Sequence, residues 1–569
     1  MTAQSESTTA VVDDGGIEGD GRPEGPPQSE AGAGRRAVQR RVAPVMLLAV
    51  LIPLALLTWR AMHAPINFDG GMNLQVARRL ANGEGYTRFY EELSVFPHEV
   101  QTNGPYIYLA AAGIKLFGAN QFAYQFSNLV FVAAFSITVS LLLLRESAVV
   151  RIVGPFVVLL TVPLIPIYGL GGLGEIPTSF FLFAAILALV EAVRSPKRSP
   201  QWVLGASVAF GAAVATKTFA VGAAGVVAMG LVCVVLAAPS RRVRWQVVLA
   251  AGGVAVVPVV REAHRLWTLG SLGGYRAWWA DQSDSVTAQS GLDGAGGDGP
   301  VQTFLDHMHV LARLADFPAE LLLVVLFLPL AWVCGLVVWR CREQGVRTAL
   351  ADPATVLVLL VGVMAASYIL WWMLLLPDNK LWIRRIMPGV LALHLLYLLL
   401  VPWLIRGVRD ALRRSRGDAI TSSLGRVPVI GAVAALLVIA ATALPYGWQK
   451  VEGNTRATLD DPGQQAWLDA TEAAAEYVQE NGQHRYYGDE WWSAPVVSLM
   501  SGTDFHNLGV TDFCSFDPAR DRLVWDYDAK RIRSHDPWTR DGKLVYDEVA
   551  SFGDFVTIYS VGPAPGRCD

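Results

Sequence analysis

An acidic residue stands just after the first long apolar run of this 569-residue sequence. The run covers residues 42–62, and Asp69 follows it in the segment NFDGG, residues 67–71. A carboxylate at the edge of an apolar bundle is costly to remove from water, so such a residue usually has a functional role. Asp69 is therefore a candidate general base for a reacting hydroxyl. The alternative is that Asp69 caps a helix beginning near Met72, although two glycines intervene.

A second acid, Glu175, lies in the glycine-rich turn GLGGLGEIP, residues 169–177. Glycines allow such a turn to fold close against a ligand. Glu175 is thus a candidate for binding an acceptor or assisting at a metal. The alternative is an exposed Glu that interacts favourably with the dipole of the helix that follows.

Three basic residues are candidate phosphate ligands. Lys217 ends an apolar run, and Arg384 and Arg385 stand in WIRRIMPG, residues 382–389. Arginine pairs with phosphate through two parallel hydrogen bonds, which would explain its presence beside an apolar run. The alternatives are snorkelling of Lys217 to the membrane interface and interfacial anchoring by the arginines.

Several aromatic and polar residues are candidate contacts to a sugar or acceptor. They are Tyr86, His98, Asn103, Trp491 and Trp492. Sugars stack on aromatic rings, but Trp and Tyr also form interfacial belts in membrane proteins. The Trp pair lies in a polar part of the chain, where a belt is a less natural explanation, so it binds acceptor glycan or packs that part onto the membrane domain. His98 has no partner at metal-ligand spacing.

The composition places these residues in a membrane protein. The chain is 53% hydrophobic and 17% charged, with a mean hydropathy of +0.37 and a formal net charge of −3. The basic residues form short clusters between apolar runs, which argues against nucleic-acid binding. Residues 1–40 are rich in Gly, Pro, Ser and acids and are expected to be a disordered tail.

About eleven apolar runs are each long enough to cross a bilayer. Placing the N-terminus in the cytoplasm makes every internal loop basic, as the positive-inside rule requires. The fifteen-residue run 104–118 would reverse this pattern if it crossed, so we expect it to lie at the outer interface. The expected spans are 43–62, 123–144, 149–168, 178–194, 201–217, 219–239, 245–260, 319–340, 354–376, 385–405 and 427–446.

The spans predict a polytopic α-helical membrane domain with two large external loops and an external tail domain. The glycine- and serine-rich part of the second loop, 281–299, is expected to be mobile, either as a lid or as a linker. The expected segments are the cytoplasmic tail 1–40, the membrane domain 41–446, the loops 63–122 and 261–318, and the tail domain 447–569.

The tail is expected to be a small α/β domain. Residues 464–481 have the pattern of an amphipathic helix, and 485–487, 544–546 and 555–561 have that of strands. Cys514 and Cys568 both fall in this domain, on the side of the membrane where disulfides form. They form a disulfide or remain two unpaired thiols.

The order of elements resembles GT-C class membrane glycosyltransferases that use polyprenyl-phosphate sugars. The family places an Asp in the first external loop, followed by an A-x-x-L/G-x-G-Y pattern, present here at 77–86. A Pro-led helix after 102–105 and a Phe-Gly stop at 117–118 follow in the same order. Within the class, the chain is similar to the protein O-mannosyltransferase and aminoarabinose-transferase group.

The resemblance implies an inverting enzyme of the plasma membrane that transfers a monosaccharide from a polyprenyl phosphate to an envelope glycan, lipid or protein. It implies that Asp69 is the base, that Arg384 or Arg385 binds phosphate with Lys217, and that Glu175 assists. The cofactor stays open at this point: either none is required, or a divalent cation (Mg, Mn or Ca) is held by Asp69 and Glu175. The family signature has Glu after the Asp, whereas this chain has Gly70.

Two other functions remain open at this point. A transporter or lipid flippase would also be polytopic, but it would be expected to show related halves, and no internal repeat is evident. A catalytically inactive relative would serve as a scaffold or glycan-binding subunit. Turnover distinguishes this last possibility from an enzyme.

Overall fold

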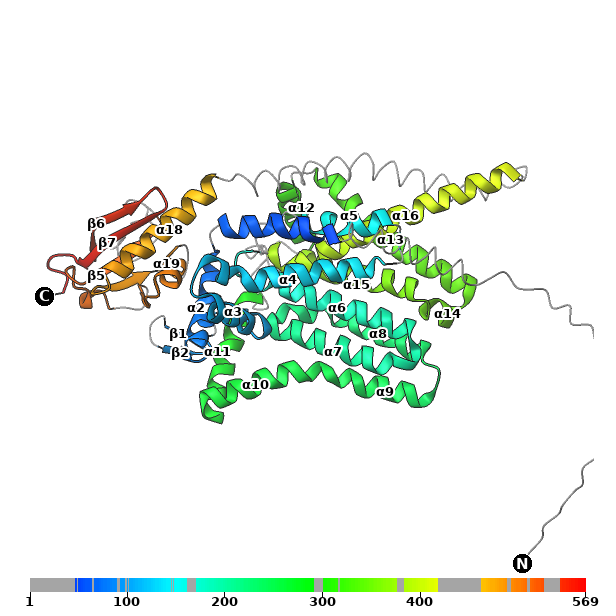
Figure 1. Ribbon diagram of the computed structural model, residues 1–569, viewed down its shortest axis with the longest axis horizontal. Helices are drawn as coiled ribbons and strands as arrows, with labels where there is room; N and C mark the ends of the chain where they lie inside the picture. Colours follow the sequence, from blue (N-terminus) through cyan, green and yellow to red (C-terminus); the bar gives the residue numbers. More distant parts are fainter. Residues whose placement is uncertain are drawn as a thin grey trace, which may run out of the picture. The chain divides into compact units, whose positions relative to one another are not determined.

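The computed structural model describes most of the chain between residues 47 and 568 (Figure 1). Residues 48–569 form one compact unit, and the contacts below all lie within it. The expected tail 1–40 and the expected span 427–446 lie outside the described residues. The described residues are 47–48, 50–63, 66–89, 93–97, 100, 102–144, 146, 148–160, 170–290, 300–315, 318–375, 383–417, 462–488, 493–508, 512–526 and 543–568.

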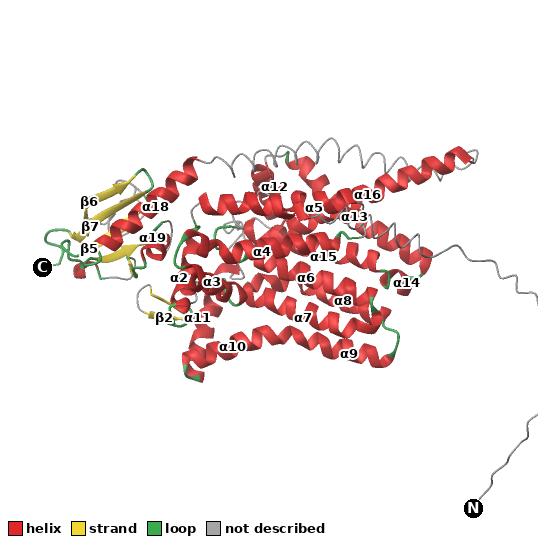
Figure 2. Cartoon of the chain, viewed as in Figure 1, coloured by secondary structure: helices red, strands yellow, loops and turns green. Residues whose placement is uncertain are grey.

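Helices dominate the structure, as Figure 2 shows, and a small group of strands lies near the C-terminus, which confirms the expected fold class. Seven helices among the described residues are long and apolar enough to cross a membrane, and three shorter apolar helices accompany them: Val50–His63, Pro105–Phe117 and Val150–Leu160. The membrane helices and their neighbours are α4 (Gln121–Leu142), α5 (Ala148–Leu160), α6 (Glu175–Arg194), α7 (Ser199–Thr216), α8 (Ala224–Ala237), α9 (Arg241–Ala251), α10 (Val256–Leu269), α13 (Ala319–Gln344), α14 (Val346–Leu350), α15 (Pro353–Leu375) and α16 (Met387–Gly417).

Helix α6 is at the centre of the membrane bundle. It packs against α4, α7, α8 and α15, and 72% of its most apolar window is buried. The continuous apolar stretch of α9 and α10 is only 11% buried, so its apolar side chains face outward. Apolar side chains on that surface are what a helix in contact with lipid requires.

Helix α2 (Phe68–Ala81) follows the first apolar helix, and its start differs from the sequence prediction. The helix begins at Phe68 rather than near Met72, and Asn67 is its N-cap: the Asn67 side chain accepts a hydrogen bond from the backbone N–H of Asp69. Asp69 therefore lies inside the first turn and is not the cap. Helix α3 (Pro105–Phe117) packs on α2, and a hairpin of β1 (Thr87–Phe89) and β2 (Leu93–Val95) joins the two.

The expected external loop 261–318 is largely helical in its described part, and the stretch expected to be mobile, 281–299, is helical as far as Ser290. Helix α10 continues to Leu269, α11 covers Leu272–Ser290 and α12 covers Pro300–Ala315. The polar stretch after 281 is helical to Ser290, and residues 291–299 lie outside the described part. The helix is anchored at its apolar start, where the Trp278 ring packs on the Arg265 guanidinium at 3.6 Å. Tertiary contact of this kind overrides a weak local preference for coil.

The tail forms an α/β domain with a five-stranded sheet in the order β4-β3-β5-β7-β6. Strands β3 and β5 are parallel, as are β3 and β4, whereas β7 is antiparallel to both β5 and β6. A disulfide joins Cys514 to Cys568. The elements are α18 (Pro462–Glu480), β3 (Arg485–Gly488), α19 (Ala494–Ser501), β4 (Phe505–Asn507), β5 (Asp521–Trp525), β6 (Leu544–Phe552) and β7 (Val556–Pro563).

Candidate functional site

Asp69 and Arg384 form an ion pair although 315 residues separate them in sequence. The Arg384 guanidinium donates to Oδ2 of Asp69, and the side chains are 13% and 18% exposed. Asp69 comes from the first turn of α2, and Arg384 comes from a short 3₁₀ helix, Ile383–Ile386, that leads into α16. The two candidates that the sequence assigned separately to proton removal and phosphate binding are therefore direct partners.

Glu175 and Lys217 form a second ion pair, and this one is enclosed. The Lys217 ammonium lies 2.6 Å from Oε1 of Glu175, and the side chains are 6% and 0% exposed. Glu175 is the first residue of α6, and Lys217 is the C-cap of α7. A buried charge without a counter-ion is strongly destabilising, so each of these two residues requires the other. Oε2 of Glu175 is also buried and has no hydrogen-bond partner among the described residues.

Arg384 also joins the two pairs into one cluster. Its Nε lies 3.8 Å from Oε1 of Glu175, so the charges alternate in the order Asp69, Arg384, Glu175, Lys217. We call these four residues the Asp69 cluster. Arg385 lies within electrostatic range of Asp69, Glu175 and Arg384. Among the described residues, Asp69 and Glu175 thus lie near three cations once Arg385 is included.

The close approach of two backbone segments sets the position of Asp69. Helix α2 touches the turn before α6 at Gly70, where an added Cβ would lie 1.8 Å from the Gly171 carbonyl oxygen. Gly172 has a φ of +78°, and the Asn73 side chain donates to its carbonyl oxygen. Glycine at position 70 is therefore required by contact, because a side chain there has no room.

The segment before α3 holds the ends of α6 and α7 together. Thr102 Oγ1 accepts from the backbone N–H of Gly174, and the backbone N–H of Asn103 donates to the Thr216 carbonyl. These two bonds tie the glycine turn and the end of α7 to one short segment. Sequence reasoning assigned no role to Thr102; its position in the TNGP motif, residues 102–105, was the available signal.

Tyr86 and Asn103, both predicted as acceptor contacts, form a hydrogen bond with each other. The Tyr86 hydroxyl donates to Asn103 Oδ1 at 3.1 Å, and its ring stacks on Phe96 and is 1% exposed. Burial raises the pKa of the Tyr86 hydroxyl, so it acts as a neutral donor. The bond holds two parts of the first loop together, and a contact of either residue with an acceptor stays a prediction. His98, Trp491 and Trp492 lie outside the described residues.

A second group of charged and aromatic residues at the end of α10 was missed by sequence reasoning. Glu262 accepts hydrogen bonds from Arg261, Arg265 and Tyr275, and Trp278 donates to the Phe96 carbonyl. Arg261 also donates to the Ala215 carbonyl, near the end of α7. The available signal was two arginines at the end of an apolar run, the same signal that identified Arg384.

The donor set of the Asp69 cluster consists of two carboxylates that each face a cationic side chain. Among the described residues, no group of three or more His, Cys, Asp or Glu side chains comes together. The carboxylates of Asp69 and Glu175 each already bind a cationic side chain, and a divalent ion would have to compete with both. Hard cations prefer several free oxygen ligands.

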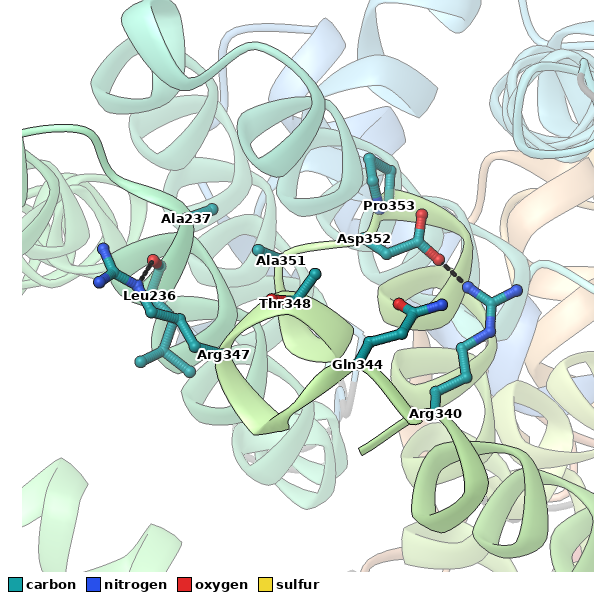
Figure 3. A pocket seen from close by; sticks show the side chains of 9 residues that line it. All are labelled: Leu236, Ala237, Arg340, Gln344, Arg347, Thr348, Ala351, Asp352 and Pro353. Carbon is teal, nitrogen blue, oxygen red and sulfur yellow. Dashed lines mark hydrogen bonds and ion pairs between the residues drawn. The ribbon is translucent and has the colours of Figure 1, made fainter. Parts of the chain in front are cut away.

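The cavity drawn in Figure 3 lies elsewhere, at the far end of α8. It measures about 660 Å³, and none of the predicted site residues lines it. Lys217 precedes the apolar stretch Thr218–Ala237, which spans about 30 Å at 1.5 Å per residue. Ala237, at the opposite end of that stretch, lines the cavity. The arginines there are engaged: Arg340 pairs with Asp352, and Arg347 donates to the Leu236 carbonyl.

Comparison with known proteins identifies the fold. No protein-family model and no curated protein sequence matches the chain. The crystal structure of ArnT from Cupriavidus metallidurans bound to undecaprenyl phosphate is similar with a TM-score of 0.56, over 90% of this chain and 97% of that chain, at 13% identity. The apo state of the same protein gives a TM-score of 0.52 with the same coverage and identity. The chain has the GT-C fold expected from its sequence.

Proposed function

We propose that this membrane protein is an inverting glycosyltransferase that moves a monosaccharide from a polyprenyl phosphate to a cell-envelope glycan, lipid or protein. The observation that supports this most directly is the Asp69 cluster, in which two carboxylates and two cations from four separate elements meet. The fold is shared with a protein whose structure contains undecaprenyl phosphate, which supports a lipid-phosphate donor.

In the proposed reaction, the donor phosphate binds Arg384 and Arg385. Phosphate offers arginine a better charged partner than a single carboxylate oxygen does. Binding therefore draws Arg384 away from Asp69, and the freed carboxylate accepts the proton of the acceptor hydroxyl. The hydroxyl oxygen attacks the anomeric carbon, the bond from that carbon to the phosphate oxygen breaks, and the polyprenyl phosphate leaves with the electron pair.

Lys217 takes a different role from the one expected on sequence. Because Lys217 is enclosed with Glu175, we assign it to holding the Glu175 carboxylate rather than to direct phosphate binding. Glu175 in turn lies near Arg384 at a different nitrogen from the one that pairs with Asp69. The proposed chemistry uses cationic side chains in place of a metal, so a chelator is expected to leave turnover unchanged.

We place the Asp69 end of the bundle outside the cell and the N-terminus in the cytoplasm. Basic residues at the opposite end support this orientation: Arg194, Lys197, Arg198, Arg241, Arg242, Arg244, Arg340, Arg342 and Arg347. In a background without native free cysteines, the thiol introduced by Glu84→Cys should react with an impermeant thiol reagent in intact cells. Protection of that position until lysis would reverse the orientation.

The test compares Asp69→Asn with wild type in purified protein, using radiolabelled polyprenyl-phosphate sugars and envelope acceptor extract. Loss of the base should lower turnover by about 10²–10⁴-fold. Donor binding should become tighter, because Arg384 no longer has a competing carboxylate. Asp352→Asn is the matched control: it makes the same change in an ion pair at the other end of the bundle, and turnover should stay near wild type.

Three results would contradict the proposal. Equal turnover in wild type and Asp69→Asn would remove Asp69 from the mechanism. Weaker donor binding by Asp69→Asn would refute the exchange of Arg384 between carboxylate and phosphate. Donor binding without transfer by wild type, across a panel of sugars, would favour a scaffold or glycan-binding role over an enzyme.

A further inference from the structure

Helix α19 of the tail domain packs directly on α2, the helix that carries Asp69. The buried guanidinium of Arg78 donates to the carbonyl oxygens of Ser498, Leu499 and Gly502 at 3.2, 2.8 and 3.0 Å. These carbonyls belong to the C-terminal end of α19, where helix carbonyls lack partners within the helix and the helix dipole favours a cation. Arg78 thus caps a helix of another domain.

The same face of α2 carries two further contacts. Gln75 donates to the Pro495 carbonyl at 2.8 Å, and a Cβ added at Gly71 would lie 3.2 Å from the backbone of Pro495 and Val496. Positions 71, 75 and 78 form one stripe of an α-helix. This stripe, which we call the α19 seam, is buried along its length.

The α19 seam is continuous with the core of the membrane domain. Val496 and Leu499 belong to the main buried apolar cluster, and Tyr124 on α4 donates to the Leu499 carbonyl. Arg88 in the first loop donates to Gln75 Oε1 and is 2% exposed. The tail domain is therefore not attached by surface contacts alone, because one of its helices completes the packing around α2.

The seam and the cluster hold α2 at different points. Gly70 contacts the glycine turn at the start of the helix, while Arg78 lies about 12 Å farther along it, at 1.5 Å per residue. A helix behaves as a stiff rod over this length, so releasing its far half lets its first turn tilt. Asp69 would then move relative to Arg384 and Glu175.

From these contacts we infer that the α19 seam is a positioning element for Asp69, and that Arg78 is its central positioning residue. The tail domain then helps to position the proposed base and is not a separate acceptor-binding module. The inference rests on the proposed function in one respect, the role of Asp69 as base. The effect of the seam on the position of α2 can be measured by amide hydrogen exchange, even if the protein shows no enzymatic activity.

The adjacent Arg79 offers a matched control on the same helix. Arg79 also reaches the tail domain, where it pairs with Asp504, but this pair lies at the surface and Asp504 is 42% exposed. Exposed ion pairs contribute little to stability. Arg78→Met and Arg79→Met therefore remove the same charge and similar volume, one from the seam and one from its edge.

The experiment measures donor kinetics and amide hydrogen exchange of residues 66–74 in the full-length protein. We expect Arg78→Met to lower kcat at least tenfold with donor KM within twofold of wild type, and to raise exchange in the first turns of α2. Arg78→Lys, which keeps the charge, should restore part of kcat. Arg79→Met should match wild type within twofold in both measurements.

Gly71→Ala supports the test if Arg78→Met fails to fold. It keeps both arginines and moves α2 and α19 apart by a few tenths of an ångström, so a smaller loss of kcat at unchanged KM is expected. Unchanged exchange at 66–74 in both seam variants would overturn the inference. A raised KM at constant kcat would also overturn it, because the tail would then act on substrate binding. If wild type shows no turnover, the proposed function fails. Amide hydrogen exchange at 66–74 still decides whether the α19 seam positions α2.

Discussion

Substitution of Gly70 by alanine tests the contact between α2 and the glycine turn. An alanine Cβ at this position would lie 1.8 Å from the Gly171 carbonyl oxygen, 2.8 Å from its carbonyl carbon and 2.9 Å from Gly172 Cα. All three atoms are backbone, so no side chain can rotate to relieve the overlap. Ordinary van der Waals contact of a Cβ begins near 3.4 Å. The two segments must therefore separate by more than about 1 Å.

The expected cost follows from this displacement. Overpacking of a well-packed interior costs about 1–3 kcal/mol and occasionally more, and we expect the upper part of that range because backbone meets backbone. Asp69 is the neighbouring residue and moves with the helix. A misplacement of about 1 Å costs about 10²-fold in rate. Gly70→Ala should therefore lower both the thermal stability and the turnover, and Gly70→Glu should not restore a second catalytic acid.

The assay is thermal unfolding in detergent together with sugar transfer at saturating donor. Gly205→Ala on α7 is the matched control, because an added Cβ there meets no atom within 4 Å. That change should be neutral or stabilising by up to about 1 kcal/mol, since alanine is the better helix former. Wild-type stability and turnover in Gly70→Ala would refute the contact and, with it, the explanation for glycine after Asp69.

Other substitutions test the Glu175–Lys217 ion pair of the Asp69 cluster and the stability of the tail domain. Glu175→Gln or Lys217→Met alone should destabilise by about 3–5 kcal/mol, because each leaves a buried charge unpaired, whereas the double substitution should recover much of the loss; additive losses in a double-mutant cycle would contradict the pairing. Burial raises the pKa of Asp526 to about 6 against an unfolded value near 3.8, so the folded tail binds the extra proton and loses stability as the pH rises from about 4 to 6. Thermal unfolding of Asp526→Asn should lack that part of the pH dependence, and an unchanged pH profile would exclude Asp526 as its source. Replacing both Cys514 and Cys568 by serine opens a loop with a sequence separation of 54 and should lower tail stability by up to about 4 kcal/mol, measured by urea unfolding; no change would indicate a reduced pair in the native protein.

Much of the architecture was predictable from local patterns. Apolar runs of membrane length predicted helices close to those observed, such as α7 at Ser199–Thr216 for the expected span 201–217. The helix expected at 464–481 corresponds to α18, Pro462–Glu480. Hydropathy and periodicity report how each residue relates to its near neighbours in sequence, and an element's existence depends mainly on those neighbours.

Predictions failed where tertiary contacts outweighed local preference. The polar stretch after 281 has a coil-like composition, yet it continues α11 to Ser290 because the start of that helix is anchored on Arg265 and Phe96. Asp69 is not the helix cap that was the alternative to a catalytic role: Asn67 caps α2, and Asp69 pairs with Arg384 across 315 residues.

The sequence by itself determined which residues carry the charge and roughly where each stands at the end of an apolar run. Asp69, Glu175, Lys217 and Arg384 were all identifiable because a charge beside a membrane helix needs a reason. Only the tertiary structure decided which of these residues pair with each other. Glu175 and Lys217 are 42 residues apart, Asp69 and Arg384 are 315 apart, and Arg78 reaches Leu499 across 421. Partners at such separations are selected by the packing of whole helices, and that packing is not encoded in any local pattern.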